Sequence, residues 1–184
     1  YEGELLAIRG WAHFKALTLF SESYTDDSAL AVPYLDYAVV LEKPARNTVG
    51  EVLAGINADL VAARNLIPAS ASNNIFMTRD AITALEARMA LYTEDYPTAI
   101  TKSTELINSY PLATTATYAA VWQDANETEN IFKLARVQGD GSIGQIYATT
   151  PIAVDWLASD KIVSLYETGD VRASAFFTDG NFIN

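Results

Sequence analysis

The sequence contains no cysteine and only one histidine among its 184 residues. The absence of cysteine excludes disulfides, thiolate metal sites and a cysteine nucleophile. One histidine without any cysteine also leaves too few of the usual ligands for a zinc site. We therefore predict neither a cofactor nor a metal.

Basic residues are also few. The chain carries 12 Lys and Arg residues against 23 Asp and Glu residues, which gives a formal net charge of -11 at pH 7. A phosphate backbone or an anionic lipid surface is repelled by such a protein over most of its surface. We expect no nucleic-acid partner.

Long apolar runs are missing as well. The most apolar stretch, residues 29–41, is interrupted by Pro33 and Asp36 and is shorter than the roughly 20 residues that a membrane-spanning helix needs. We predict no transmembrane segment. The sequence also begins without an initiator Met, a basic leader or an apolar signal core, so we interpret it as a fragment whose export signal and anchor would lie upstream.

Helical periodicity dominates the first 110 residues. Apolar residues three or four apart predict a helix over residues 3–20 with a broad apolar side: Leu5, Ile8, Ala12, Ala16 and Leu19. Residues 21–43 contain Pro33 and several polar residues, and they are predicted to form a long ordered connection.

A second helix is predicted from a capping box, in which Thr48 is followed three residues later by Glu51. One apolar face follows this start, and Pro68 ends the helix: Val52, Ile56, Leu60 and Ala63.

Two further helices are predicted to form an antiparallel hairpin, one over residues 78–92 and one from Tyr96 to just before Pro111. Pro97 suits the first turn of the second of these helices. Tyr92 and Tyr96 are expected in the core. The hairpin resembles the second half of a tetratricopeptide repeat, and the matching residues are Asp95, Tyr96, Ala99, Ile100 and Pro111.

Beyond this hairpin the pattern is irregular. We predict a repeat-like helical scaffold over residues 1–112 and a loop-rich segment of the same domain, incomplete here, over residues 113–184. Within that segment we expect a helix or turn at residues 160–166 and a strand at residues 175–178. The predicted fold class is mainly α, an α-α superhelix with tetratricopeptide-like hairpins.

Several motifs could carry chemistry, but none predicts a catalytic residue. Glycines 139, 141 and 144 match G-x-G-x-x-G, yet the α/β context of a dinucleotide site is missing, so we interpret them as a loop. His13 has no G-x-S-x-G nucleophile to serve and is interpreted as structural. The carboxylate pairs 26/27, 94/95 and 127/129 lie in polar stretches, and spacing alone cannot show that two of them converge as in a glycosidase.

Exposed aromatic rings offer the remaining candidate for ligand binding. The flat apolar face of a Trp or Tyr matches the C–H face of a sugar ring, and its rim can make hydrogen bonds. Trp122 and Trp156 lie in irregular segments, so they are the predicted ligand-binding residues.

Read in order, a series of motifs resembles that of the SusD/RagB family of outer-membrane nutrient-binding lipoproteins. An early helix with Arg9 and aromatic residues leads into a Val-Pro step at residues 32–33, and RNTVGEVLAGINADLVAARNLIP follows at residues 46–68. Later come an Ala-rich helix after Arg79, the DY-x-x-A helix, YPL at residues 110–112, ENIF at residues 129–132 and LYETGDVR at residues 165–172. Members of the family are several hundred residues long, so this chain resembles their central part.

The resemblance implies non-catalytic binding of a glycan or other nutrient at the bacterial outer surface. The ligand would pass to a SusC-like, TonB-dependent transporter, and an upstream lipidated Cys would anchor the protein to the outer membrane. Two alternatives stay open, a repeat-type adaptor for other proteins and a glycoside hydrolase fragment. The adaptor would show further repeat copies, and only one clear copy is present. The hydrolase would need two carboxylates that converge in a cleft.

Overall fold

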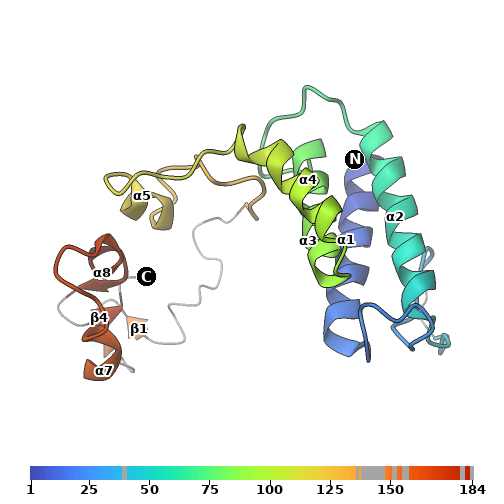
Figure 1. Cartoon of the computed structure of the whole chain (residues 1–184), viewed down its shortest axis with the longest axis horizontal. Coiled ribbons are helices and arrows are strands. Elements are labelled where there is room, and N and C mark those ends of the chain that lie inside the picture. Colours follow the sequence, from blue (N-terminus) through green and yellow to red (C-terminus); the bar gives the residue numbers. More distant parts are fainter. Residues whose placement is uncertain are drawn as a thin grey trace. The chain divides into compact units, whose positions relative to one another are not determined.

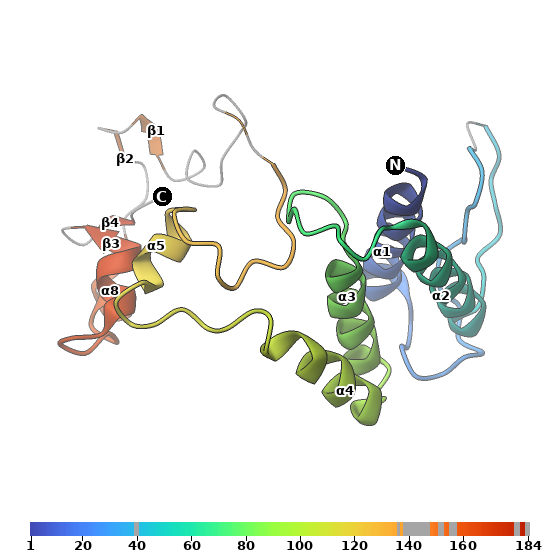
Figure 2. The ribbon, with the colours of Figure 1, turned by 90° about the horizontal axis from the view of Figure 1, so that it is seen from above.

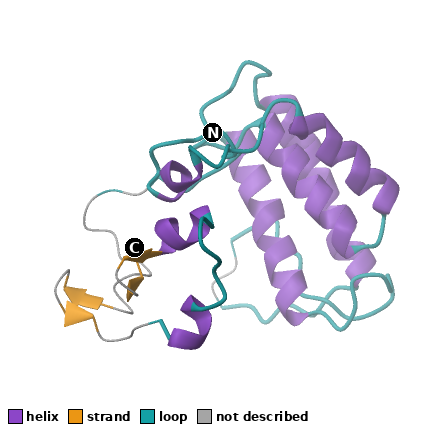
Figure 3. Cartoon of the chain, turned by 60° about the vertical axis from the view of Figure 1, so that its left-hand side comes forward, coloured by secondary structure: helices purple, strands orange, loops and turns teal. Residues whose placement is uncertain are grey.

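The computed structural model describes residues 1–38, 41–135, 137, 148–150, 153–154, 158–178 and 181–182. These residues form two compact units: residues 1–109 with 131–133, and residues 110–130 with 134–184. The long helices all lie in the first unit, and short elements make up the second (Figures 1 and 3). The mainly α class predicted from the sequence is confirmed.

Side-chain caps begin three of the four long helices, α1 (Glu2–Phe20), α2 (Val49–Leu66), α3 (Arg79–Tyr92) and α4 (Tyr96–Ile107). The capping box of α2 is present: Thr48 Oγ1 accepts from the Glu51 N–H, and Glu51 accepts from the Thr48 N–H. Each bond satisfies a backbone donor that has no partner within the helix. Thr78 caps α3 by accepting from the Ala81 N–H, and Asp95 caps α4 by accepting from the Thr98 N–H, without a reciprocal bond.

Helices α1 and α2 pack side by side (Figure 2) because glycines let their backbones approach. A Cβ on Gly3 would lie 2.9 Å from Ile67 Cγ1, and one on Gly10 would lie 3.2 Å from Leu60 Cδ2. The predicted apolar face of α2 is fully buried at this contact. The core cluster draws on α1, α2, α3 and the segments that join them: Ala7, Phe14, Leu17, Ala31, Val49, Val52, Ile56, Leu60, Ala63, Ile67, Met77, Ala81, Ile82, Leu85 and Met89.

The predicted first helix is confirmed, but most of the residues that predicted it face outward. Leu5 and Leu19 are 66% and 64% exposed, and Ile8 is 44% exposed. The buried side of α1 instead carries Gly3, Ala7, Gly10, Phe14 and Leu17. Helix α1 is thus apolar on two opposite sides, and only one of these sides packs against the other helices of unit 1.

Helices α3 and α4 form the predicted antiparallel hairpin (Figure 1). The expectation that Tyr92 and Tyr96 lie in the core is wrong, because their side chains are 40% and 54% exposed. Tyr92 packs edge-on against both Phe14 and Tyr24 at the surface of unit 1, and Tyr96 lies in the first turn of α4.

The predicted long connection joins α1 to α2. Leu30 forms an isolated antiparallel bridge with Thr48. The Arg46 guanidinium donates to the carbonyl oxygens of Phe20, Leu30 and Ala31. These bonds join the end of α1 to the start of α2.

The second unit contains α5 (Tyr118–Trp122), α7 (Asp160–Val163) and α8 (Val171–Phe176). Two short antiparallel pairs accompany them, β1 (Ala148–Thr150) with β2 (Ala153–Val154), and β3 (Phe177–Thr178) with β4 (Asn181–Phe182). The strand expected at residues 175–178 occupies only its last two residues, because α8 continues through Phe176.

One short segment of the C-terminal region packs with unit 1. Ile131 is partly buried against the helical core, and the Lys133 N–H donates to the Asn74 carbonyl oxygen at 2.9 Å. The boundary at residue 112, and the assignment of both parts to one domain, stay predictions. No helix in the part of the chain that the structure describes is long and apolar enough to cross a membrane.

Candidate functional site

The first candidate site is an aromatic cluster around Trp122, the residue predicted from sequence to bind a ligand. The Trp122 cluster consists of Tyr118, Trp122 and Phe176. Trp122 and Phe176 meet edge-to-face with ring centroids 4.8 Å apart, and Tyr118 lies 6.2 Å from Trp122 and 6.3 Å from Phe176. These contacts hold α5 against α8.

The indole of Trp122 keeps free surface despite these contacts, since its side chain is 56% exposed. In edge-to-face packing the rim of one ring contacts the face of the other. The part of the Trp122 indole that stays exposed can therefore still contact a ligand. Trp156, the second predicted ligand-binding residue, lies outside the described residues.

Next to this cluster, a cap and an ion pair hold the start of α8. Asp170 accepts from the Arg172 N–H, and the Arg172 guanidinium binds the same carboxylate at 2.7 to 3.2 Å. Hydrogen bonds from Arg172 lower the pKa of Asp170. The guanidinium carbon also lies 5.5 Å from the centre of the Tyr166 ring, within range of a cation–π contact. The LYETGDVR motif thus orders the segment that carries Phe176.

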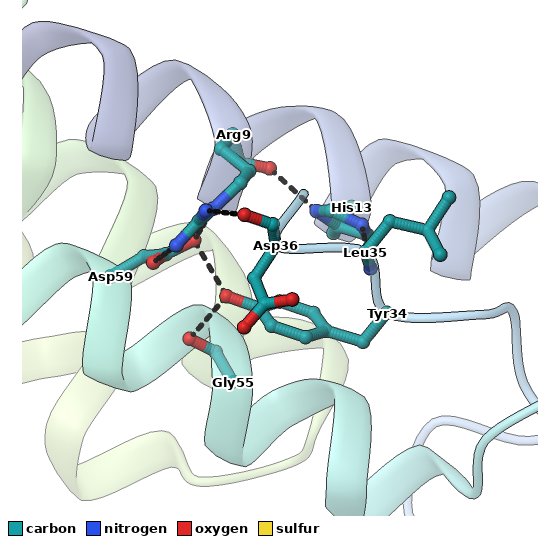
Figure 4. Close-up of polar contacts among 7 residues, drawn as sticks. All are labelled: Arg9, His13, Tyr34, Leu35, Asp36, Gly55 and Asp59. Atoms are coloured by element: carbon teal, nitrogen blue, oxygen red, sulfur yellow. Dashed lines mark hydrogen bonds and ion pairs between the residues drawn. The ribbon is translucent and has the colours of Figure 1, made fainter. Parts of the chain in front are cut away.

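The second candidate is a polar network between α1, α2 and the connection (Figure 4). Arg9 Nε and Nη2 donate to the two carboxylate oxygens of Asp59 at 2.8 and 2.5 Å. The Tyr34 hydroxyl lies 2.7 Å from Asp59 Oδ2 and 3.0 Å from the Gly55 carbonyl oxygen, so its single proton is shared between two acceptors. Arg9 Nη1 donates to the Asp36 carbonyl oxygen at 3.1 Å.

His13 completes the polar network from the side of α1. The Leu35 N–H donates to Nε2 at 3.0 Å, and Nδ1 lies 3.0 Å from the Arg9 carbonyl oxygen. Because Nε2 accepts, the proton of the neutral ring belongs on Nδ1, where it is donated to Arg9. The ring also stacks at a tilt on Tyr34, with centroids 4.5 Å apart.

The electrostatics of the network favour a fixed charge pair. Burial opposes the charge on Asp59, but hydrogen bonds from Arg9 and Tyr34 outweigh it and lower the pKa of the carboxyl. The hydrogen bond to Asp59 raises the pKa of Arg9, despite burial. Burial, followed by the hydrogen bond to Asp59, raises the pKa of Tyr34 to about 12.

The polar network suits a structural role rather than proton transfer. A general acid or base works best with a pKa near the working pH, whereas hydrogen bonds lower the pKa of Asp59 and burial raises the pKa of Tyr34, both away from neutrality. Both carboxylate oxygens of Asp59 are occupied by groups of the protein itself. The network therefore fixes the connection onto the helices.

One member of each of the three carboxylate pairs considered from sequence has a structural contact. Asp95 caps α4, Asp26 accepts from Ser28 in a turn, and Glu129 accepts from the Ala113 N–H at 2.6 Å. Glycines 139, 141 and 144 lie outside the described residues. Within the described ranges, no group of three or more His, Asp or Glu side chains is placed to hold a metal ion.

Comparison with known proteins finds a family match over about the first half of the chain. Residues 1–91 match a family model described as "Starch-binding associating with outer membrane". No curated protein matches the chain significantly.

Solved structures extend the similarity to most of the chain. A SusD superfamily protein from Bacteroides vulgatus ATCC 8482 is 30% identical, with a TM-score of 0.66 over 75% of this chain. One from Bacteroides thetaiotaomicron VPI-5482 is 24% identical, with a TM-score of 0.78 over 97% of this chain. A SusD-like carbohydrate binding protein from Bacteroides vulgatus ATCC 8482 is 22% identical, with a TM-score of 0.71 over 95%. The chain spans only 33%, 42% and 40% of these three relatives.

Proposed function

Since this chain belongs to the SusD-like family, we propose that its protein binds carbohydrate at the bacterial outer membrane without cleaving it. The match of residues 1–91 to a starch-binding, outer-membrane-associated family carries this proposal. The bound glycan would be delivered to a SusC-like, TonB-dependent transporter. Anchoring through an upstream lipidated Cys stays a prediction.

The polar network agrees with binding rather than catalysis. Its buried carboxylate, Asp59, is held as a charged acceptor by Arg9 and Tyr34. A glycosidase needs one protonated carboxyl group as the acid and one ionised carboxylate that reaches the sugar or a water. The lowered pKa of Asp59 does not suit the first role, and its burial with both oxygens hydrogen-bonded does not suit the second. The helices that carry the network would serve as a scaffold for binding surfaces elsewhere in the protein.

We assign part of the glycan contact to Trp122. Its half-exposed indole on α5 can stack on a pyranose ring, and the edge-to-face contact with Phe176 fixes the orientation of the indole before the ligand arrives. A ring that is already ordered loses less side-chain entropy on binding. Trp156 is assigned to the same function from the sequence pattern alone.

The test is isothermal titration of the complete protein that carries this sequence against soluble starch and other polysaccharides, with product analysis run alongside. We expect binding without released oligosaccharide. Trp122→Ala should weaken binding about five- to tenfold, or about 1 to 1.4 kcal/mol. Trp11→Ala is the matched control, because Trp11 is also a partly exposed indole but lies on α1.

Each outcome bears on a different part of the proposal. Release of oligosaccharide would replace the binding function with hydrolysis. Equal losses for the two Trp variants would remove Trp122 from the site while leaving carbohydrate binding in place. Absence of binding to every polysaccharide would favour the adaptor alternative, in which the helices bind another protein.

A further inference from the structure

Arg172 lies beside the Trp122 cluster, on the same side of α8 as Phe176. The two residues are four positions apart in α8, and residues at this spacing are neighbours on one face of a helix. Phe176 in turn contacts both Trp122 and Tyr118. Asp170 raises the pKa of Arg172 most, through its hydrogen bonds, and the nearby hydroxyl of Tyr118 adds to this effect. The guanidinium therefore flanks the aromatic cluster.

The guanidinium of Arg172 uses only one of its edges to bind Asp170. Nε donates to Asp170 Oδ1 and Oδ2 at 3.0 and 3.2 Å, and Nη2 donates to Oδ2 at 2.7 Å. A guanidinium carries its N–H groups in a planar fork, so the edge formed by Nη1 and the second N–H of Nη2 faces away from Asp170. The side chain of Arg172 is 58% exposed. This outer edge can donate two hydrogen bonds to neighbouring hydroxyl groups of a sugar.

The orientation of the outer edge is fixed before a ligand binds. Asp170 holds one edge of the guanidinium, and the Tyr166 ring centre lies 5.5 Å from the guanidinium carbon. Tyr166 is itself held by an edge-on contact with Phe177, with ring centroids 5.2 Å apart. A side chain that is already ordered loses less entropy on binding. The cap of α8 does not need this side chain, because Asp170 accepts from the backbone N–H of Arg172.

We propose that Arg172 hydrogen-bonds the glycan that stacks on Trp122, and that its pairing with Asp170 selects uncharged sugars over uronates. The proposal rests on the carbohydrate binding proposed above. Two N–H groups in a planar fork suit two hydroxyls on adjacent carbons of a pyranose. An unpaired arginine would favour a carboxylate instead, because the fork binds carboxylates bidentately. Asp170 cancels that charge and repels a sugar carboxylate, and such a repulsive element is a common source of specificity.

Isothermal titration of the complete protein that carries this sequence tests the contact with Arg172. The probes are soluble starch and galactan, which are uncharged, and polygalacturonate and alginate, which consist of uronates. Arg172→Met should weaken binding of an uncharged polymer about five- to tenfold, because two hydrogen bonds are lost. Arg172→Lys should also weaken it, since an ammonium keeps the charge but not the fork. Arg88→Met, which removes another exposed arginine, on α3, is the matched control and should leave the affinity unchanged.

Asp170→Asn tests the selection by charge. Asn caps a helix about as well as Asp, so α8 keeps its cap while the guanidinium loses its counter-charge. The affinity for polygalacturonate, divided by that for an uncharged polymer, should rise about tenfold. Adding Arg172→Met should abolish this rise. Asp160→Asn, which removes another exposed carboxylate of unit 2, is the control and should leave the ratio unchanged.

Two conditions keep these measurements specific. The titrations are made at about 0.15 M salt, where charges more than about 8 Å apart are largely screened, so that the net charge of -11 has little influence on the ratio. Circular dichroism and the Tm of each variant are compared with those of the parent. If Arg172→Met does not fold, Arg172→Lys and Asp170→Asn decide the question, because they keep the positive charge and the cap.

The results that would overturn the proposal differ from those that bear on carbohydrate binding itself. Binding of uncharged polymers that is as tight for the Arg172 variants as for the parent would remove Arg172 from the site and leave the proposed function in place. An unchanged ratio in Asp170→Asn, or tighter binding of uronates by the parent, would refute the selection by charge. Absence of binding to all four polymers would overturn both proposals together, and no other outcome does so.

Discussion

Replacing Asp59 by Asn should destabilise unit 1 more than any surface charge substitution. Asp59 is 4% exposed and accepts two hydrogen bonds from Arg9 and one from Tyr34. Asn keeps the shape but turns an N–H group toward donors and leaves the Arg9 charge without a counterion. Breaking a buried pair costs about 3 to 5 kcal/mol. Because the Arg9 side chain is 31% exposed and keeps some water, we expect about 2 to 3 kcal/mol here.

The assay is urea unfolding followed by far-UV circular dichroism, which reports mainly on the helices of unit 1. Glu105→Gln, an exposed substitution on α4, is the control and should change the free energy of unfolding by less than about 0.5 kcal/mol. If Asp59→Asn lowers the free energy of unfolding by no more than this control does, the polar network does not hold the connection on the helices, and the structural role assigned to it is refuted.

A double-mutant cycle separates the pair from its surroundings. Arg9→Met and Asp59→Leu should each be costly alone, because each leaves a polar partner unsatisfied. Together they should cost much less than the sum, since replacing both members of a buried pair by apolar residues is often close to neutral. Additive losses would mean that the two residues act independently.

The contribution of Asp59 should also depend on pH in a defined direction. The pKa of Asp59 is lowered in the folded state. Above the pKa of about 3.9 that the carboxyl has in the unfolded chain, the carboxyl is ionised in both states, and its full contribution to stability is present. As the pH falls below about 4 the unfolded carboxyl is protonated first. The stability difference between the parent and Asp59→Asn should therefore be largest near neutral pH and shrink below about pH 4.

Three further substitutions test neighbouring contacts, each followed by thermal or urea unfolding. Gly55→Ala should destabilise although Ala is the better helix former by about 1 kcal/mol, because its new Cβ would lie 2.7 Å from ring atoms of Tyr34; a rise in Tm would contradict that contact. Tyr34→Phe should cost about 1 to 2 kcal/mol through the lost hydroxyl hydrogen bonds, and a neutral result would show that the hydroxyl stabilises nothing. Thr48→Ala should cost about 1 kcal/mol by removing the cap of α2, whereas Thr48→Ser keeps the cap oxygen and should be near neutral.

Helix starts and lengths could be predicted from sequence because their determinants are local. The capping box of Thr48 and Glu51, Pro97 in a first turn and the stop at Pro68 act within a few residues, and α2 and α4 begin where these signals place them. Such local signals do not determine which side of a helix faces the core. In α1 the apolar and small residues of both sides recur with nearly the same spacing, so periodicity alone did not show that Leu5 and Leu19 point outward.

A signal for the correct side was nevertheless present in α1. Gly3, Ala7 and Gly10 form a row of small residues, and such rows mark close helix approach. Gly3 and Gly10 are the positions where a Cβ would meet α2 at 2.9 and 3.2 Å. The small residues, rather than the large apolar ones, indicated the packed side.

An acidic, mainly helical, SusD-like chain could be predicted from composition, helix caps and ordered motifs, because each of these is a property of residues close together in the sequence. Which distant residues contact one another became known from the three-dimensional fold. Arg9 and Asp59 are 50 positions apart, and Trp122 and Phe176 are 54 apart in the numbering. Such pairs form because helix packing and loop closure bring distant segments together, and the free energy of those contacts depends on three-dimensional distances that no local pattern specifies.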